Sequence, residues 1–397
     1  MRRTLTIIAT TVVVIGLISV GYLYWTNRTP AIVVTPQPTD TGLPTSGDSQ
    51  PVIENSGTST TPTTPATIPP RLVKISAGPV VPGMVVVDIK ASSTTPSEVV
   101  TKYIERQSGN IFSYQTMSRT LTRTSNKTIP GIQSASWLSD GSYAYVRYLS
   151  DPTFSTINTY AISADGAIGF FLPQNLADIS IASSSLLTLA SGVNGSTATV
   201  SRFDGSHTAT VFSTALTALR AAFAGKSQYV VFTKPSTTLD GYAFTVDSRG
   251  RFSRIAGPQA GLVALPSPSG KWALITYTLN QSPQMELVNT GTGETIALPI
   301  ATIADKCVWA PDELSIYCGI PITAPHANYP DDWYEGALHF SDRIWKIQVA
   351  GRYAQLVLDF TKETQATLDL QAPAIDAQNS TLVFVNKNDG ALWSYSL

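Results

Sequence analysis

The chain has 397 residues, of which 43% are hydrophobic and only 13% are charged. This charged share is well below the roughly 25% of an average soluble domain and is typical of a Ser/Thr-rich, β-rich protein outside the cytoplasm. A net charge of -1 excludes the basic surface that nucleic-acid binding requires. The two cysteines and the histidines at 207, 326 and 339 have no metal-ligand spacing, so we expect neither a bound metal nor another cofactor.

Residues 5–25 form an uncharged segment rich in Val, Ile and Leu, which as a helix rises about 31 Å and spans a bilayer core. Arg2 and Arg3 precede this segment, so the positive-inside rule predicts that residues 1–4 are cytoplasmic and that the rest lies outside. A cleaved signal peptide is the alternative, but the apolar run is long and ends at Trp25 rather than in small residues. We therefore predict a single-pass signal anchor.

Residues 26–70 are dominated by Thr, Pro and Ser and contain no aromatic residue. Such a segment cannot bury a core, so we predict a disordered linker. Its proline content favours extended conformers, and it would act as a semi-stiff stalk for the domain that follows. A proline-rich docking ligand is the alternative, but that kind of ligand carries interleaved basic residues that are missing here.

The remaining residues, 71–397, contain repeated pairs of short apolar runs that meet at a tight polar turn, which is the pattern of a β-hairpin. Five of the six spacings between successive turns lie between 41 and 45 residues, and the sixth is 66 residues. A period of about 40 to 45 residues with four strands per repeat is the signature of propeller blades. We predict an all-β, seven-bladed β-propeller, with hairpin turns at Ser97, Gly141, Ser184, Gly225, Gly270, Glu313 and Asn379.

The last repeat ends at Leu397 after its third strand and therefore lacks an outer strand. The segment at residues 71–79 is similar to residues 251–258, which form the fourth strand of their own repeat and its link to the next. We therefore predict that Arg71–Ser76 completes the last blade, which begins near Ala372. This closure leaves only short, protected blade edges.

Three of the hairpins carry related turns, at residues 137–141, 266–270 and 309–313. They resemble the Trp-Ser-Pro-Asp-Gly-like turns of TolB-like and dipeptidyl-peptidase-type β-propellers, a WD-like class of repeat. The resemblance covers most of residues 71–397 and implies the propeller fold. The sequence shows neither the α/β-hydrolase domain of the peptidases nor the α/β domain of TolB, so we carry over neither peptidase activity nor a TolB-like role.

Five Asp-Gly pairs begin at residues 140, 165, 204, 240 and 389 and could supply calcium ligands, but Asp-Gly is also the preferred chemistry of tight turns. No pair lies in a run of closely spaced carboxylates, so we favour the turns. A Gly-x-Ser-x-Gly nucleophile motif is absent, and scattered histidines do not predict a catalytic triad.

Cys307 and Cys318 lie at equal distances on either side of the turn at Asp312 and Glu313. A symmetric hairpin places them opposite each other on adjacent strands, within reach of a disulfide. An extracytoplasmic location permits this bond, and two buried thiols are the alternative.

The repeat with the longest spacing contains an insertion, residues 320–342, on the face opposite the hairpin turns. The insertion concentrates aromatic and acidic residues, which suit contact with a protein or a glycan. A structural plug that packs on its own blade and closes the channel is the alternative. The predicted binding residues, centred on the tryptophan, are Tyr329, Asp331, Asp332, Trp333, Tyr334 and Glu335.

These features favour a non-enzymatic binding or scaffolding module of the cell envelope, with an envelope protein or a glycan as its partner and the membrane contacted through the N-terminal helix. The alternative is a propeller hydrolase or lyase with its site at the mouth of the channel. We favour the first because the sequence lacks recognisable catalytic motifs.

Overall fold

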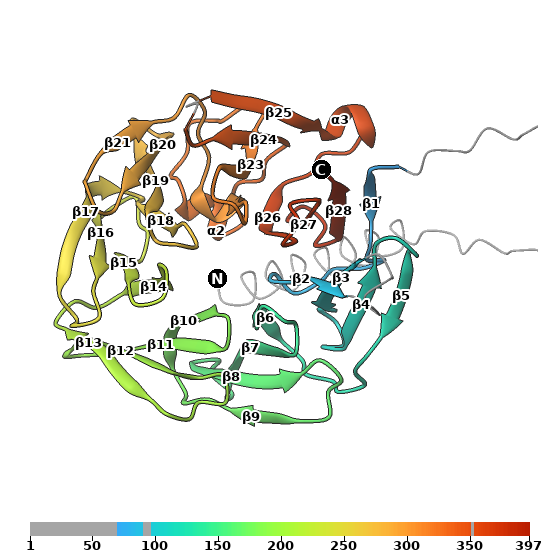
Figure 1. Cartoon of the computed structure of the whole chain (residues 1–397), viewed down its shortest axis with the longest axis horizontal. Helices are drawn as coiled ribbons and strands as arrows, with labels where there is room; N and C mark the ends of the chain where they lie inside the picture. Colours follow the sequence, from blue (N-terminus) through green and yellow to red (C-terminus); the bar gives the residue numbers. More distant parts are fainter. Residues whose placement is uncertain (1–69, 90–96, 351–352) are drawn as a thin grey trace, which may run out of the picture. The chain divides into compact units, whose positions relative to one another are not determined.

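The computed structural model describes residues 70–89, 97–350 and 353–397, and these form a ring of seven blades around a central axis (Figure 1). Each blade is a four-stranded antiparallel sheet, and its first strand lies nearest the axis. The predicted anchor, residues 5–25, and all but the last residue of the predicted linker lie outside the described residues. Within the described ranges, no helix is long and apolar enough to cross a membrane.

Six blades are each built from four consecutive strands, and the first three lie between residues 85 and 214. Blade one contains β2 (Val85–Ile89), β3 (Glu98–Ile104), β4 (Ile111–Gln115) and β5 (Thr120–Arg123). Blade two contains β6 (Ile132–Trp137), β7 (Tyr143–Ser150), β8 (Thr156–Ser163) and β9 (Gly169–Phe171). Blade three contains β10 (Leu176–Ala182), β11 (Ser185–Gly192), β12 (Gly195–Arg202) and β13 (Ala209–Thr214).

The next three blades follow the same order and add three short helical segments. Blade four contains β14 (Leu219–Phe223), β15 (Tyr229–Thr233), β16 (Asp240–Val246) and β17 (Phe252–Ala260). Blade five contains β18 (Val263–Pro266), β19 (Trp272–Leu279), β20 (Ser282–Asn289) and β21 (Thr295–Ala297). Blade six contains β22 (Cys307–Trp309), β23 (Ser315–Pro321), β24 (Asp342–Gln348) and β25 (Tyr353–Asp359). The helical segments are η1 (Ala304–Lys306), α2 (Asp331–Tyr334) and α3 (Phe360–Glu363).

The seventh blade joins the two ends of the propeller. It contains β26 (Leu370–Ile375), β27 (Thr381–Asn386), β28 (Leu392–Ser396) and, as its outermost strand, β1 (Leu72–Lys74). The Arg71 guanidinium adds two hydrogen bonds to the carbonyl oxygen of Ser396, at 3.0 and 2.7 Å. The predicted closure of the last blade by the segment Arg71–Ser76 is therefore confirmed.

The second strand of each blade explains why the apolar runs in the sequence are nearly continuous. Each blade is packed between two others, so both faces of its central strands are buried and an alternating polar face is not needed. In β27, for example, the four residues from Leu382 to Val385 are all buried. The same is true of Tyr229–Phe232 in β15. These strands form the apolar layers between blades.

The hairpin turns that carry the sequence motif hold neighbouring blades together. The indole Nε1 of Trp137 donates to the carbonyl oxygen of Gly83 at 3.3 Å, and Trp309 donates in the same way to Leu265 at 3.2 Å. Glu313 occupies the position where two of the related turns have glycine, and it adopts a φ of 57°. Its carboxylate accepts hydrogen bonds from the backbone N–H and the hydroxyl of Ser269 in the preceding blade. Where this turn has Glu313 in place of glycine, the glutamate side chain thus adds a contact between blades five and six.

Candidate functional site

The connection between β23 and β24 is the insertion expected from the longest repeat, and it contains α2. It lies toward the axis, near the starts of the innermost strands β18 and β26 (Figure 1). We call this end of the ring the insertion face; it comprises residues 322–341 and the starts of the innermost strands. The hairpin turns lie at the opposite end, because strand direction alternates within each blade.

Hydrogen bonds from two other blades hold the insertion in place. In blade five, Thr278 Oγ1 donates to the carbonyl oxygen of Tyr329 at 2.6 Å. From blade four, the backbone N–H and the hydroxyl of Thr237 donate to Asp331 Oδ2 at 2.9 and 2.8 Å. Asp332 accepts a backbone N–H from the loop that precedes α2, at 2.9 Å. The Asp331 and Asp332 carboxylates therefore help to fix the position of the insertion.

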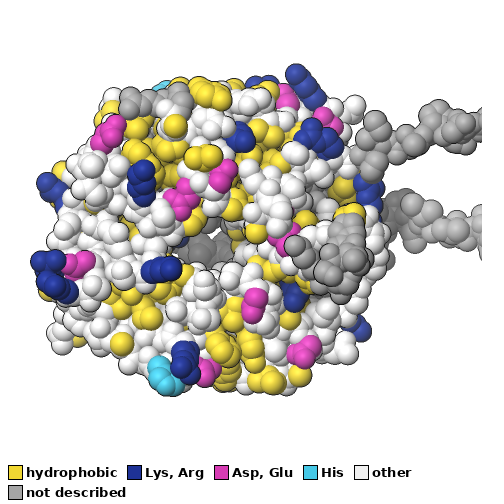
Figure 2. All heavy atoms as spheres, in the orientation of Figure 1, with side chains coloured by type: hydrophobic (Ala, Val, Ile, Leu, Met, Phe, Trp, Pro, Cys, Tyr) yellow, Lys and Arg dark blue, Asp and Glu magenta, His cyan; other side chains and the backbone are white. Residues whose placement is uncertain are grey.

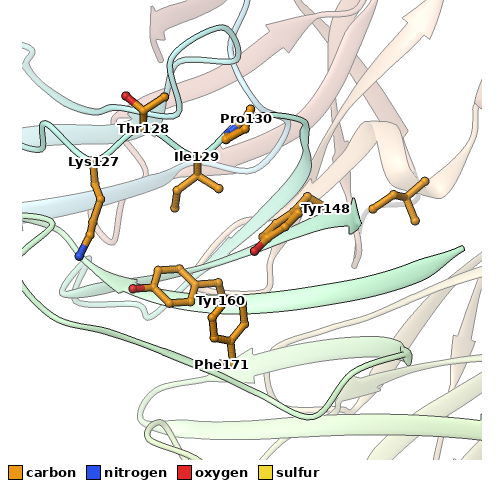
Figure 3. Close-up of a pocket in the computed structure, with 8 residues that line it drawn as sticks. Lys127, Thr128, Ile129, Pro130, Tyr148, Tyr160 and Phe171 are labelled. Carbon is orange, nitrogen blue, oxygen red and sulfur yellow. The ribbon is translucent and has the colours of Figure 1, made fainter. Parts of the chain in front are cut away.

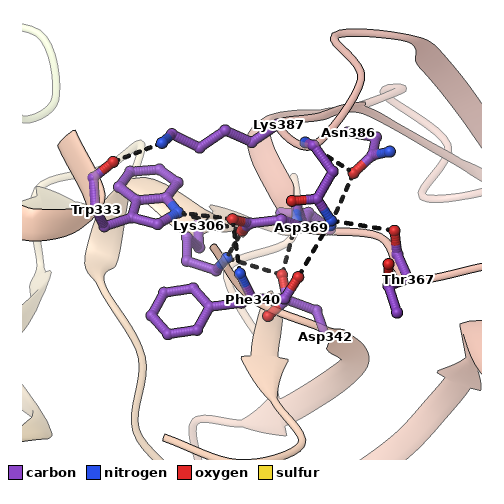
Figure 4. A network of polar contacts seen from close by, with 10 residues as sticks. Lys306, Trp333, Phe340, Asp342, Thr367, Asp369, Asn386 and Lys387 are labelled. Atoms are coloured by element: carbon purple, nitrogen blue, oxygen red, sulfur yellow. Dashed lines mark hydrogen bonds and ion pairs between the residues drawn. The ribbon is translucent and has the colours of Figure 1, made fainter. Parts of the chain in front are cut away.

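Trp333 lies inside the protein and is only 1% exposed. Its indole Nε1 donates to the Asp369 carboxylate, and the Lys387 ammonium donates to its carbonyl oxygen at 2.6 Å (Figure 4). Tyr329 is also buried, at 2% exposed. We therefore correct the expectation that Trp333 offers contact area to a partner, because its surface is already covered by the propeller. Tyr334 and Glu335 are the members of the predicted set that are exposed.

Beneath the insertion, three charged side chains meet in a site with no exposure to solvent. The Lys306 ammonium contacts Asp369 Oδ1 and lies 2.8 Å from Asp342 Oδ2, and all three side chains are 0% exposed (Figure 4). The Lys306 ammonium also lies 5.1 Å from the Trp333 ring centroid and 4.6 Å from that of Phe340. The network joins η1, β24 and the entry to β26, and thus connects blades six and seven.

Asp342 is the least satisfied member of this network. Its Oδ2 accepts from Lys306 and from the backbone N–H of Leu370 at 2.7 Å, whereas its Oδ1 is buried and has no hydrogen-bond partner among the described residues. Burial raises the pKa of Asp342 to about 6; the Lys306 charge opposes the rise and the Asp369 charge adds to it. Asp342 therefore holds a proton more readily than an ordinary carboxyl group.

A second cluster lies where the insertion meets the axis. Arg220 on β14, an innermost strand, makes two hydrogen bonds to the Asp305 carboxylate, at 3.0 and 3.4 Å. The Tyr334 hydroxyl donates to Asp305 Oδ2 at 2.7 Å. The side chains of Arg220 and Asp305 are 36% and 29% exposed, and Tyr334 is 39% exposed. Viewed along the axis, the ring has a central hollow with basic and acidic side chains beside it (Figure 2).

The electrostatics of this cluster keep each group in its ordinary ionisation state at neutral pH. Burial opposes ionisation of Asp305, but the Arg220 charge and the hydrogen bonds from Arg220 and Tyr334 outweigh it and lower the pKa of Asp305. Partial removal of the Tyr334 hydroxyl from water, where it meets Asp305, raises the pKa of Tyr334 well above its usual value, and the Asp305 charge adds to the rise. The Asp305 charge raises the pKa of Arg220 despite its burial. The cluster thus holds a cation, an anion and a neutral phenol in fixed positions.

Comparison with known proteins identifies similar folds. Oligogalacturonate lyase from Vibrio parahaemolyticus matches at 8% identity over 82% of this chain and 93% of that chain, with a TM-score of 0.55. Kuenenia stuttgartiensis hydrazine synthase matches at 11% identity over 82% and 97%, with a TM-score of 0.52. TolB from Acinetobacter baumannii matches at 11% identity over 79% and 80%, with a TM-score of 0.43. No model of a protein family matches the sequence, and no curated protein matches it.

At such low identities, these similarities concern the fold alone. Together with the ring of seven four-stranded blades, the two matches with the higher TM-scores confirm the propeller that the hairpin turns predicted. The activities in the names of these proteins are not assigned to this chain on the basis of a shared fold.

Cys307 and Cys318 are directly opposed in the register of β22 and β23, and the structure joins them by a disulfide. Their Cα atoms lie 4.1 Å apart. The bond crosses the first hairpin of blade six, immediately after Lys306. It constrains the blade that carries both the insertion and part of the buried network.

Asp-Gly pairs serve the turns in which they lie, with the exception of Asp240 and Gly241, which begin β16. The carboxylates of Asp140, Asp165 and Asp204 each accept the backbone N–H of the residue two positions later, at 2.9 Å. This local bond is the reason that aspartate favours turns. In the part of the chain that the structure describes, no three His, Cys, Asp or Glu side chains are grouped so as to hold a metal ion.

An apolar groove of about 430 Å³ lies far from these clusters in sequence, along blade two and the link from blade one (Figure 3). Tyr160 and Phe171 form one wall, with ring centroids 4.8 Å apart, and Ile129 and Tyr148 also line the groove. Among the described residues that line the groove, Lys127 is the one with a charged side chain. None of these residues is among those predicted from the sequence.

Four residues of the two clusters, Lys306, Asp369, Arg220 and Asp305, were not among those predicted from the sequence. A weak signal exists for one of them. Asp369 lies between Leu368 and Leu370 at the start of an innermost strand, and an isolated charge in such an apolar setting marks a buried polar site. Its partners cannot be read from the sequence, because Lys306 is 63 residues away.

Proposed function

We propose that this protein is a binding or scaffolding module of the cell envelope. A membrane anchor at residues 5–25 holds its N-terminus in the cytoplasm and displays the propeller outside, where it binds an envelope protein or a glycan through the insertion face. The observation that carries this proposal is the fixed cluster of Arg220, Asp305 and Tyr334 at the axis. A tyrosine beside a charged pair provides contact area together with directional hydrogen bonds.

The support beneath the cluster favours recognition by a preformed surface. Tyr334 follows Trp333 in α2, and Trp333 is fixed by Asp369 and Lys387. The short helix therefore has little freedom to move when a partner binds. Rigid aromatic residues on a supported loop reduce the entropy that binding costs.

The alternative is a hydrolase or lyase with its site at this mouth of the channel. General acid and base groups work best with pKa values near the operating pH. Here the pKa of Asp305 is lowered and those of Tyr334 and Arg220 are raised, away from neutrality. These directions favour a role in binding over a role in proton transfer.

The proposal is tested by capture with the full-length protein in detergent, using envelope proteins and a panel of envelope glycans as candidate partners. We expect Tyr334→Ala and Arg220→Met to weaken capture by roughly 2 kcal/mol or more, since truncation of a central contact costs about that much. Arg249→Ala, in an exposed turn on the opposite face, is the control and should leave capture unchanged. Equal capture by all three variants would remove the insertion face as the binding surface. Turnover of a glycan by the unmodified protein would instead establish the alternative.

A further inference from the structure

The buried network beneath the insertion brings an amine and a carboxyl group into contact away from water. Lys306 Nζ contacts Asp369 Oδ1, and both side chains are 0% exposed. The Trp333 and Phe340 rings lie near the ammonium. A buried ion pair is costly because both charges lose their hydration, and a dry site also favours condensation because water is a product. The contact is therefore suited to bond formation as well as to charge pairing.

The surroundings of Asp369 would activate its carboxyl carbon toward a nucleophile. Oδ2 accepts the backbone N–H of Phe340 at 3.0 Å and the indole N–H of Trp333 at 3.1 Å. Two fixed N–H donors on one oxygen stabilise the negative charge that develops there when a nucleophile adds to the carbon. The other oxygen, Oδ1, shares the Trp333 indole N–H at 3.2 Å, faces Lys306 and is placed to leave.

Asp342 supplies the proton transfers that the condensation needs. Its Oδ2 lies 2.8 Å from Lys306 Nζ, and its buried Oδ1 has no hydrogen-bond partner in the part of the chain that the structure describes. The raised pKa of about 6, caused mainly by burial, fits a carboxyl group that gives and receives a proton. Lys306, Asp369 and Asp342 together supply every group that the condensation needs, so no external reagent is required.

We propose that Lys306 and Asp369 form an intramolecular amide bond, with Asp342 as the proton-transfer group. A proton passes from the Lys306 ammonium to the Asp369 carboxylate, and the neutral Nζ attacks Cγ of Asp369. The C–N bond forms and the bond from Cγ to Oδ1 breaks, while Asp342 accepts a proton from the nitrogen and donates one to the departing oxygen. One water molecule leaves, and no oxidant or reductant takes part.

The bond links η1, at the entry to blade six, with the residue immediately before β26 in blade seven. It replaces a buried cation and a buried anion by a neutral amide, which removes the cost of keeping both charges dry. The Trp333 and Phe340 donors remain paired with the amide oxygen. The insertion therefore sits over a covalent junction between adjacent blades.

The experiment is a tryptic peptide map of the full-length protein after denaturation and reduction. We expect no cleavage after Lys306, and a single species in which peptide 272–343 is joined to peptide 363–387 with the loss of one water. Lys306→Arg should give only linear peptides. Lys387→Arg, which retains the neighbouring positive charge, is the matched control and should keep the cross-link.

Asp342→Asn tests the role of the third residue. It should give linear peptides from protein whose far-ultraviolet circular dichroism and cooperative unfolding match those of a folded propeller. A full yield of linear peptides from the unmodified protein would overturn the proposal and leave Lys306 and Asp369 as an ion pair only. A cross-link retained in Asp342→Asn would overturn the role given to Asp342.

Discussion

The indole Nε1 of Trp333 hydrogen-bonds to both carboxylate oxygens of Asp369, at 3.2 and 3.1 Å. This contact ties α2 in blade six to the entry of β26 in blade seven. It makes the insertion an integral part of the fold rather than an appendage.

We expect Trp333→Ala to lower the free energy of unfolding by about 3 to 5 kcal/mol, because it leaves a large cavity and removes a donor from a buried carboxylate. Glu335 is exposed and directly follows α2, so Glu335→Ala should change the free energy of unfolding by no more than about 0.5 kcal/mol. Urea unfolding of the two variants measures the difference. Similar values for both would mean that the insertion does not support the propeller.

Removal of β1 should open the ring. A chain that begins at Pro79 lacks the outermost strand of blade seven and the hydrogen bonds from Arg71 to Ser396. We expect it to unfold at a markedly lower temperature than a chain that begins at Arg71, because β28 becomes an unpaired edge. Calorimetry of the two shortened chains provides the test, and equal melting temperatures would contradict the closure.

Gly261 should resist substitution for two separate reasons. Its φ is +67°, and a Cβ there would lie 2.2 Å from the carbonyl oxygen of Tyr329 in the insertion. Gly293 has a similar φ of +74° but open space around it, so it isolates the backbone effect. We expect Gly293→Ala to cost about 1 to 2 kcal/mol from the left-handed conformation. Gly261→Ala should lower the free energy of unfolding by clearly more and should increase proteolysis within residues 322–341. Equal losses for the two variants would show that the insertion moves to accommodate the added methyl group at little cost.

The Asp305 carboxylate should contribute to stability only when it is ionised. Its pKa is lowered in the folded state, so the contribution is present above its ordinary pKa of about 4 and is lost as the pH falls through the lower folded value. We expect Asp305→Asn to cost about 1 to 2 kcal/mol at pH 7, from the weakened hydrogen bonds to Arg220 and Tyr334. The cost should shrink toward pH 2 in acid-dependent unfolding measurements. A difference that stays constant with pH would contradict this account.

The proposed location gives a further prediction. If residues 5–25 anchor the chain with its N-terminus inside, protease added outside intact cells or spheroplasts should cut residues 26–70 and release the propeller. Immunoblotting with an antibody to the propeller detects the released fragment. Complete protection in intact cells, with cleavage only after lysis, would reverse the orientation.

The regular features of the fold could be predicted because they repeat in the sequence. The turns at Gly141, Gly270 and Glu313 recur at intervals of three blade lengths and one blade length, and the segment at residues 71–79 resembles the outer strand of another repeat, residues 251–258. The residue preferences of tight turns and of buried strands are sufficient to predict both the turns and this outer strand.

The buried network could not be predicted, because blade packing, not local sequence, brings Lys306 and Asp369 together. The burial of Trp333 could not be predicted for a related reason. An aromatic residue among acidic ones resembles an exposed contact site, but Asp331 bonds to another blade and Trp333 turns inward. The directions in which the Asp331 and Trp333 side chains point depend on where the insertion packs in the folded propeller.

The pairing of β1 with β28 also sets the order of events during synthesis. Leu72 is made long before Tyr395, yet they are partners in the same sheet. The blades between them can therefore fold while the chain is still growing, but the ring cannot close until β28 has emerged. A chain that terminates before β28 would leave β1 without its partner, so only chains that extend through β28 would become closed propellers.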